Sequence, residues 1–213
     1  MLRWAWILRG LQTPLLDLST LKASKDASFG ARECVMLHIC CAPDATVPLV
    51  DLKAEGWKPH GFFYGSNIHP EAEYRRRLDA LMRLREKEFF PLRVSSYEPE
   101  EWFSAVESFL DEPEGGERCI ACFSLQLTAA ARCAVELGCS CLCTTLTISP
   151  HKDVRRIDSL GQALCLSYGL KWLGRVWRKN DGFLRSLKMT EALGLYRQNY
   201  CGCACSMRTE KGR

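Results

Sequence analysis

The chain has 213 residues, 47% of them hydrophobic, which is enough for one substantial core and predicts a single main domain. The net charge of +4 is compatible with a polyanionic partner but does not establish one. No apolar stretch approaches the roughly 20 residues that a membrane-spanning helix needs, and no clear small-residue cleavage site follows the aromatic-rich start. We therefore expect a cytoplasmic protein without a membrane segment or a secretory signal.

Residues 1–33 are expected to form an extension or linker, because they end in a polar stretch that contains Gly and Ser. The main domain follows over residues 34–213, where short apolar runs alternate with amphipathic segments. In chain order we expect a strand at 34–40, a helix at 45–56, a strand at 58–65, a helix at 70–89, a strand at 91–96, a helix at 98–110, a helix at 121–138, a strand at 139–149, a helix at 153–169 and a strand at 170–177. Repeated units of this kind predict an α/β domain with a Rossmann-like core, in which helices cover both faces of a parallel sheet.

Three polar segments follow predicted strands and are therefore expected at one edge of the sheet. They are HICCAPD after the first strand, YGSNIHP after the second, and TISPHKD after the strand at 139–149. In open α/β sheets, ligands bind beyond the carboxyl ends of the strands. This edge is the predicted functional site.

Thirteen cysteines are a heavy load for this length. A secreted disulfide scaffold is usually shorter, and the adjacent Cys40 and Cys41 are placed awkwardly for ordinary bridges. The odd count in a cytoplasmic chain indicates thiolate metal ligands together with inert core cysteines.

The cysteines that we expect to be functional fall into three pairs, which are Cys40 with Cys41, Cys119 with Cys122, and Cys201 with Cys203. Cys119 and Cys122 form a Cys-x-x-Cys at a loop-to-helix junction, where the helix N-terminus favours thiolates. Six thiols and the carboxylate of Asp44 exceed what one tetrahedral zinc needs. A four-thiolate iron–sulfur cluster would leave two cysteines and Asp44 for a second ion or for redox work.

The other cysteines are expected to be structural. Cys139, Cys141 and Cys143 alternate along a predicted strand, which would point them the same way into the core. Core positions are also expected for Cys133 and Cys165, an inert position for Cys34, and a bystander role for Cys205. His38, two residues before Cys40, is either a hydrogen-bond donor to the site or a satisfied buried histidine.

Five segments resemble the cobalamin-independent epoxyqueuosine reductases of the QueH type, and the resemblance spans about residues 35–206. The segments are LHICCAPD, NIHPEAEYRRRL, ERCIAC, TTLTISPHKD and KNDGFLRS…LYRQNYCGC. The resemblance implies a HUP-like fold and the last step of queuosine biosynthesis, the reductive removal of the epoxide oxygen from epoxyqueuosine in the anticodon loop of tRNA. It also implies a [4Fe–4S] cluster beside a mononuclear iron, and an unidentified low-potential electron donor.

Carried over by position, the resemblance places Cys40, Cys119, Cys122 and Cys201 on the cluster, and Cys41, Asp44 and Cys203 on the mononuclear iron. Which member of Cys40/Cys41 and of Cys201/Cys203 binds which centre stays open. Some relatives carry a cysteine where this chain has Asp44, so the carboxylate ligand is an inference. The extension before residue 34 lies outside the shared pattern.

Basic and polar side chains near the same edge are candidates for the tRNA. Phosphate contacts are predicted for Arg75, Arg76, Arg77, Arg83, Arg85, Lys87, Lys152, Arg155 and Arg156, with a solvated helix face as the alternative. Substrate handling is predicted for Asn67, His69, His151 and Lys152. Stacking or proton donation is predicted for Tyr64, Tyr74, Tyr196 and Tyr200, with core packing as the alternative.

Two other functions remain open. A non-catalytic, zinc-stabilised RNA-binding module would close a four-sulfur site with Cys119, Cys122, Cys201 and Cys203, and would leave Cys40 and Cys41 unexplained. A thiol–disulfide oxidoreductase would use the adjacent or Cys-x-x-Cys thiols, and would need neither Asp44 nor the cysteines near the end of the chain. Iron and sulfide in the purified protein would distinguish the reductase from both.

Overall fold

The computed structural model describes residues 34–207, so the predicted extension at 1–33 lies outside the described residues. The five strands are β1 (Cys34–Ile39), β2 (Lys58–Phe63), β3 (Leu92–Val94), β4 (Cys141–Thr144) and β5 (Lys171–Trp172). All neighbouring strands are parallel, in the order β3-β2-β1-β4-β5. The helices are α1 (Ala42–Ala54), α2 (Glu71–Glu88), α3 (Pro99–Val106), α4 (Glu117–Glu136), α5 (Val154–Ser167) and α6 (Gly182–Ala192). The predicted α/β class with a parallel sheet is confirmed.

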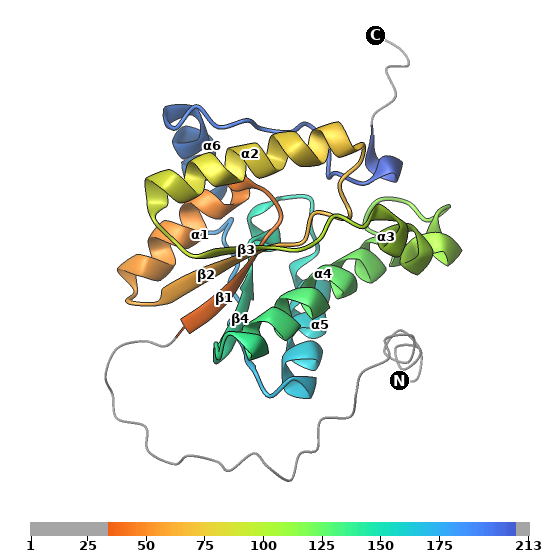
Figure 1. Ribbon diagram of the computed structural model, residues 1–213, viewed down its shortest axis with the longest axis horizontal. Coiled ribbons are helices and arrows are strands. Elements are labelled where there is room, and N and C mark those ends of the chain that lie inside the picture. Colours follow the sequence, from red (N-terminus) through yellow and green to blue (C-terminus); the bar gives the residue numbers. More distant parts are fainter. Residues whose placement is uncertain (1–33, 208–213) are drawn as a thin grey trace. The chain divides into compact units, whose positions relative to one another are not determined.

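Helices cover both faces of the sheet (Figure 1). On one face, α1, α2 and α6 pack over a cluster that contains Leu37, Leu49 and Leu81. On the other face, α4 and α5 pack over a cluster that contains Met36 and Ala130. Because Met36 and Leu37 are adjacent in β1 and face opposite sides, the central strand is buried on both faces.

The helix α4 corrects the expectation that no segment is long and apolar enough to span a membrane. By length and composition α4 passes that test, but 72% of its apolar window is buried inside the fold. Its apolar character is explained by packing, because α4 contacts β1, α3 and α5. It is the core helix of this domain.

Several predicted boundaries are wrong near the functional edge. The helix expected from residue 45 begins at Ala42, with Cys41 as its N-cap and Pro43 in its first turn, a position that suits proline. The strand expected at 139–149 ends at Thr144, because the chain turns into a short 3₁₀ helix over Leu146–Ile148. Local apolar patterns do not distinguish this turn from a continued strand.

The chain order places a topological switch point at the carboxyl ends of β1 and β4. From β1 the chain builds β2 and β3 on one side, and it then returns to add β4 and β5 on the other side. The connections after β1 and β4 therefore diverge, which is where α/β sheets bind ligands. Cys40 follows β1, and its backbone N–H donates to Thr145 Oγ1, just after β4, at 3.2 Å.

Cys139 is buried in the core as predicted, but the disulfide that joins it to Cys34 was not predicted. Cys139 precedes β4, so it does not follow the alternation of Cys141 and Cys143. Those two thiols pack on the α1 face of the sheet, whereas Cys139 packs on the α4 face.

The burial of β1 predicts different stability losses for a substitution in this strand and for one at an exposed position. Replacing Leu37, which is fully buried, in the variant Leu37→Ala should cost about 2–5 kcal/mol of unfolding free energy, because it leaves a cavity between β1 and α1. The control Leu166→Ala removes an 84% exposed side chain and should change stability by less than about 0.5 kcal/mol. Urea unfolding measures both, and equal losses would contradict the assignment of β1 to the core.

Candidate metal centre

The first group of candidate ligands lies where β1 passes into α1. The ligand atoms of Cys40, Cys41 and Asp44 all lie within 4.8 Å of one another. Cys40 Sγ is 3.2 Å from Asp44 Oδ2 and 3.2 Å from Thr145 Oγ1. Asp44 is in the first turn of α1, where the helix N-terminus favours negative charge.

The pKa values of Cys40 and Asp44 are both raised, as expected for neighbouring acids in a buried site. The hydrogen bond with Cys41, burial and the charge of Asp44 together raise the pKa of the Cys40 thiol well above its usual range. Burial likewise raises the pKa of Asp44, although its hydrogen bonds to the two thiols oppose the shift. A bound positive charge reverses these shifts, because it favours the deprotonated form of both groups.

The second pair, Cys119 and Cys122, lies in the first two turns of α4. Three residues apart on a helix, the two thiols share a face. Burial is the main cause that raises the pKa of the Cys122 thiol. Repulsion from three neighbouring thiols adds to the rise, namely those of Cys201, Cys203 and Cys119. Cys119 packs in the same apolar cluster as Cys40, which links the helix pair to the first group.

The third pair, Cys201 and Cys203, is held in place by Arg77 of α2. The Arg77 guanidinium donates to the carbonyl oxygens of Cys201 at 2.9 Å and of Tyr200 at 3.2 Å. Gly202 between the two cysteines has a φ of 134°, a conformation that favours glycine, and a Cβ there would lie 3.0 Å from Arg77 Nη1. The backbone conformation and the close approach of Arg77 together explain the glycine between the two cysteines.

Arg77 is itself fixed by a buried ion pair. Its Nε donates to Glu73 Oε1 at 2.7 Å, and the side chains are only 2% and 6% exposed. The other carboxylate oxygen of Glu73 accepts from the hydroxyl of Tyr196 at 2.8 Å. On the opposite side, His69 donates its backbone N–H to Gly202 O at 2.8 Å, and its Nδ1 accepts from Ala204 N at 3.3 Å.

Three side chains donate N–H groups to candidate ligand sulfurs. Gln198 Nε2 is 2.9 Å from Cys41 Sγ, Gln126 Nε2 is 3.0 Å from Cys122 Sγ, and Lys152 Nζ is 3.0 Å from Cys201 Sγ. Burial lowers the pKa of Lys152, but the Cys201 thiol outweighs this effect, so the net shift is upward and the ammonium is retained. Sequence reasoning missed both glutamines, because nothing local marks them.

His38 lies behind Gln126 and is fully buried. Thr144 Oγ1 accepts from the backbone N–H of Leu146 at 3.2 Å and lies within hydrogen-bond distance of His38 Nδ1, at 2.9 Å. Burial lowers the pKa of His38 to about 4, against an opposing contribution from Gln126. The ring is therefore neutral, and because Gln126 influences its pKa and also contacts Cys122, His38 lies one residue removed from the candidate ligands.

The structure thus brings the predicted site residues into one neighbourhood from three parts of the chain. The donor set fits an iron–sulfur cluster together with a further ion, because it offers six thiols and one carboxylate in a largely buried setting. The buried indole N–H of Trp102, which has no hydrogen-bond partner among residues 34–207, lies beside Cys122 and opposes the rise in its pKa. Sulfur ligands are tuned by N–H groups of this kind. Cys205 is exposed, unlike these candidate ligands.

Several predicted phosphate contacts are corrected. Arg77 is buried against the Cys201 loop, and the side chain of Lys152 is only 10% exposed and contacts Cys201. Arg156 donates to Glu117 and to the carbonyl of Gly115. The hydroxyl of Tyr200, a predicted proton donor, already donates to the carbonyl oxygen of His69. Arg77 and Lys152 therefore build the site, whereas the phosphate contacts predicted for Arg156, which is 30% exposed, and for the exposed arginines stay predictions.

Comparison with known proteins identifies the family. The family model for "Epoxyqueuosine reductase QueH" matches residues 35–209. The chain belongs to the epoxyqueuosine reductase QueH family. QueH of Thermotoga maritima is 34% identical over 182 residues, which cover 83% of this chain and 93% of that protein. QueH of Streptococcus pyogenes serotype M1 is 36% identical over 186 residues, which cover 84% and 72% of the two chains.

As a member of the QueH family, the chain is an oxidoreductase, and the expected family and enzyme class are confirmed. A solved structure, the predicted subunit of a tRNA methyltransferase from Methanocaldococcus jannaschii, aligns with a TM-score of 0.52 at 16% identity and covers 74% of each chain. At this low identity the likeness shows the fold alone. It agrees with the parallel Rossmann-like sheet described above.

Arg77 and Arg75 give a matched test of the loop anchor, because each pairs with a glutamate four residues earlier in α2. Arg77→Gln should cost about 3–5 kcal/mol of stability, because it leaves Glu73 buried without its partner. It should also lower the iron content, because the Cys201 loop loses its two carbonyl contacts. Arg75→Gln, whose side chain is 72% exposed, should leave iron and stability nearly unchanged. Equal iron contents in the two variants would contradict the anchoring role.

Proposed function

We propose that this QueH-family chain removes the epoxide oxygen of epoxyqueuosine in tRNA and leaves the alkene of queuosine, in the cytoplasm. The observation that carries the proposal is the meeting of three cysteine pairs and Asp44 beside the carboxyl ends of β1 and β4. The catalytic domain is proposed to span residues 34–213. The change consumes two electrons and two protons and releases one water, so an electron donor of low potential is part of the proposal.

We further propose how the ligands are divided. Cys40, Cys119, Cys122 and Cys201 would hold a [4Fe–4S] cluster, and Cys41, Asp44 and Cys203 would hold a mononuclear iron. The carboxylate oxygen of Asp44 is a hard ligand, which suits an iron that must also accept an oxygen-bearing substrate. Asp44 contacts Cys40 and also hydrogen-bonds to Cys41, so either of these two thiols is close enough to share an ion with the carboxylate.

When bound, the cluster would supply electrons one at a time, and the mononuclear iron would act as a Lewis acid toward the epoxide oxygen. The chain's own groups set the conditions for this chemistry. The ammonium of Lys152 and the amides of Gln126 and Gln198 donate to the sulfurs, which offsets thiolate charge and makes reduction easier. Burial of the surrounding thiols excludes water from the reacting atoms.

The substrate nucleotide is proposed to enter through a cavity of about 470 Å³ next to the Cys201 loop. It is lined by Pro70, Ala72, Glu73, Arg76, Tyr196, Arg197, Asn199 and Tyr200. Arg76 and Arg197 are exposed and can meet phosphates, whereas the guanidinium of Arg77 lies 5.1 Å from the ring centre of Tyr200 and holds that ring in place. An anticodon-loop base splayed out of its stack suits a site lined by tyrosine rings.

The two rival functions account for less of the site. A closed four-sulfur zinc site would leave Cys40, Cys41 and Asp44 as a second, unused group of converging ligands. A thiol–disulfide oxidoreductase needs a thiol of lowered pKa, but burial raises the pKa of Cys122 in the Cys-x-x-Cys pair. Both observations favour a metal-dependent reductase.

The proposal is tested on protein purified without oxygen. Iron and acid-labile sulfide should be present, and turnover of tRNA that contains epoxyqueuosine should follow when a low-potential reductant is supplied. A colourless, zinc-loaded protein would support the binding module instead. Iron and sulfide without turnover would remove the substrate assignment and leave the metal assignment intact.

The division of ligands predicts different results for two cysteine variants. Cys203→Ala should lose turnover by roughly 100-fold or more while most of the cluster absorbance remains, because only the mononuclear iron loses a ligand. Cys122→Ala should lose the cluster absorbance itself, because a cluster thiolate is removed. Complete loss of the cluster in Cys203→Ala would show that the proposed division is wrong.

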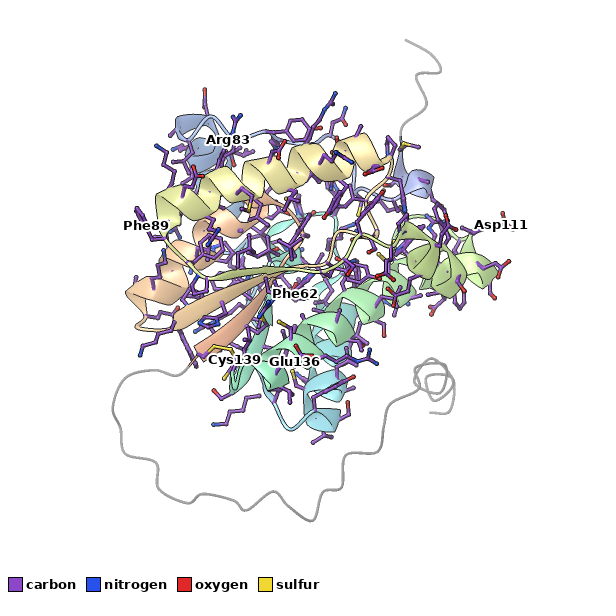
Figure 2. The ribbon with its side chains drawn as sticks, in the orientation of Figure 1. Phe62, Arg83, Phe89, Asp111, Glu136 and Cys139 are labelled. Carbon is purple, nitrogen blue, oxygen red and sulfur yellow. A yellow bond between two sulfur atoms is a disulfide. The ribbon has the colours of Figure 1, made fainter. Side chains whose placement is uncertain are left out.

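The cavity predicts a change in the salt dependence of tRNA binding. The double variant Arg76→Ala, Arg197→Ala should lower the slope of log affinity against log salt by about 1.4, the value expected for two lost contacts to single-stranded phosphates. Arg83→Ala is the control, because Arg83 is exposed on the same helix and does not line the cavity (Figure 2). If both proteins show the same slope, the tRNA does not enter here.

A further inference from the structure

A second group of potential ligands lies at the other end of the sheet. The ligand atoms of Cys34, His60 and Cys139 all lie within 4.8 Å of one another. Cys34 opens β1, His60 is in β2, and Cys139 is in the connection between α4 and β4 (Figure 2). Cys34 and Cys40 are six residues apart, or roughly 20 Å at about 3.3 Å per strand residue, so this group is not part of the first centre.

The strand register explains why these side chains meet. Cys34 pairs with Lys58, and Met36 pairs with His60, so the Cys34 and His60 side chains project from the same face of the sheet. The connection after α4 is held against β1 by a hydrogen bond from Ser140 N to Cys34 O, at 3.3 Å. Cys139 N also donates to Ala134 O at 2.9 Å, which ties Cys139 to the last turn of α4.

The end of α4 places negative charge near this group. The carbonyl end of a helix carries partial negative charge, and Cys139 lies just beyond that end of α4. Glu136 adds a carboxylate, and the last turn of α4, which lies wholly within the described residues, contains no basic side chain. Lys58 pairs with Cys34 and adds one positive charge on the same face of the sheet. Two thiolates would still repel each other and the end of α4, and a bound cation relieves that repulsion.

We propose that Cys34, His60 and Cys139 form a binding site for a divalent ion of the zinc class when the two cysteines are reduced, with water as the fourth ligand. Two thiolates and one imidazole are ligands that Zn²⁺ prefers. Cys34 and His60 are half-buried, which leaves one side of the site open to solvent, and Cys139 is buried. The ion would tie β1 and β2 to the α4–β4 connection, and it is independent of the proposed reductase chemistry.

In the structure the two sulfurs form a disulfide, which is the alternative state of the same site. A dithiol reductant supplies two electrons and two protons, breaks the sulfur–sulfur bond and itself becomes a disulfide. Zinc then replaces the two thiol protons. The sulfurs must separate to about 3.7 Å around a tetrahedral ion, and rotation of the two side chains allows this with Cα atoms 4.7 Å apart.

The test uses the full chain with its iron centre loaded. The protein is reduced with dithiothreitol without oxygen, exposed to zinc sulfate, desalted and analysed for bound zinc. Wild type should retain about one more zinc per chain than Cys34→Ser or His60→Gln. The control Cys165→Ser removes a buried thiol of the same apolar cluster that lies outside the ligand group, and it should retain the zinc of wild type.

A second measurement separates loss of a ligand from loss of the fold. His60→Gln keeps both cysteines and the position in β2, so its unfolding midpoint should stay near that of wild type. Cobalt in place of zinc should give a sulfur-to-cobalt charge-transfer band in wild type that is lost in Cys34→Ser. Equal zinc in wild type and His60→Gln would overturn the proposal. So would peptide mapping that finds the Cys34–Cys139 disulfide intact after reduction.

Discussion

The geometry of the metal centre depends on one guanidinium. Arg77 reaches from α2 to the carbonyls of Tyr200 and Cys201, and its partner Glu73 is buried beside it. A buried charge pair of this kind adds little net stability, but breaking it is costly, so it specifies one position for the loop. Without that contact, the last cysteine pair would be a short coil near the end of the chain. With it, the pair lies beside the Cys122 thiol of α4.

A second constraint is the raised proton affinity of the site. The hydrogen bond with Cys41 and burial raise the pKa of Cys40, burial and repulsion between thiols raise that of Cys122, and burial raises that of Asp44. When these groups are deprotonated, their negative charges repel one another in a buried site. A bound positive ion removes that repulsion. The donors around it, which include Lys152 and Gln126, reduce the same repulsion from outside. The fold thus prepares the thiols for metal, and the surroundings adjust their charge.

The strand β1 connects two sulfur sites of different character. Its carboxyl end leads to Cys40 at the N-terminus of α1, where the helix favours anions, and its amino end begins with Cys34 near the carbonyl end of α4. The environment of Cys40 suits a thiolate that stays deprotonated as a ligand of a cluster. That of Cys34 favours either a disulfide or a bound cation. One parallel sheet thereby offers two environments to the same residue type.

Sequence alone determined the α/β class, the parallel sheet and the three cysteine pairs with Asp44, because strand–helix alternation and ligand spacing are local properties. It could not separate Arg77 from Arg75 and Arg76, because which arginine of the run is buried depends on how α2 packs. It also missed Gln126 and Gln198, and it placed Cys139 with Cys141 although the strand begins two residues later. The tertiary structure alone decided these contacts, because each joins residues whose distance is set by packing rather than by the chain between them.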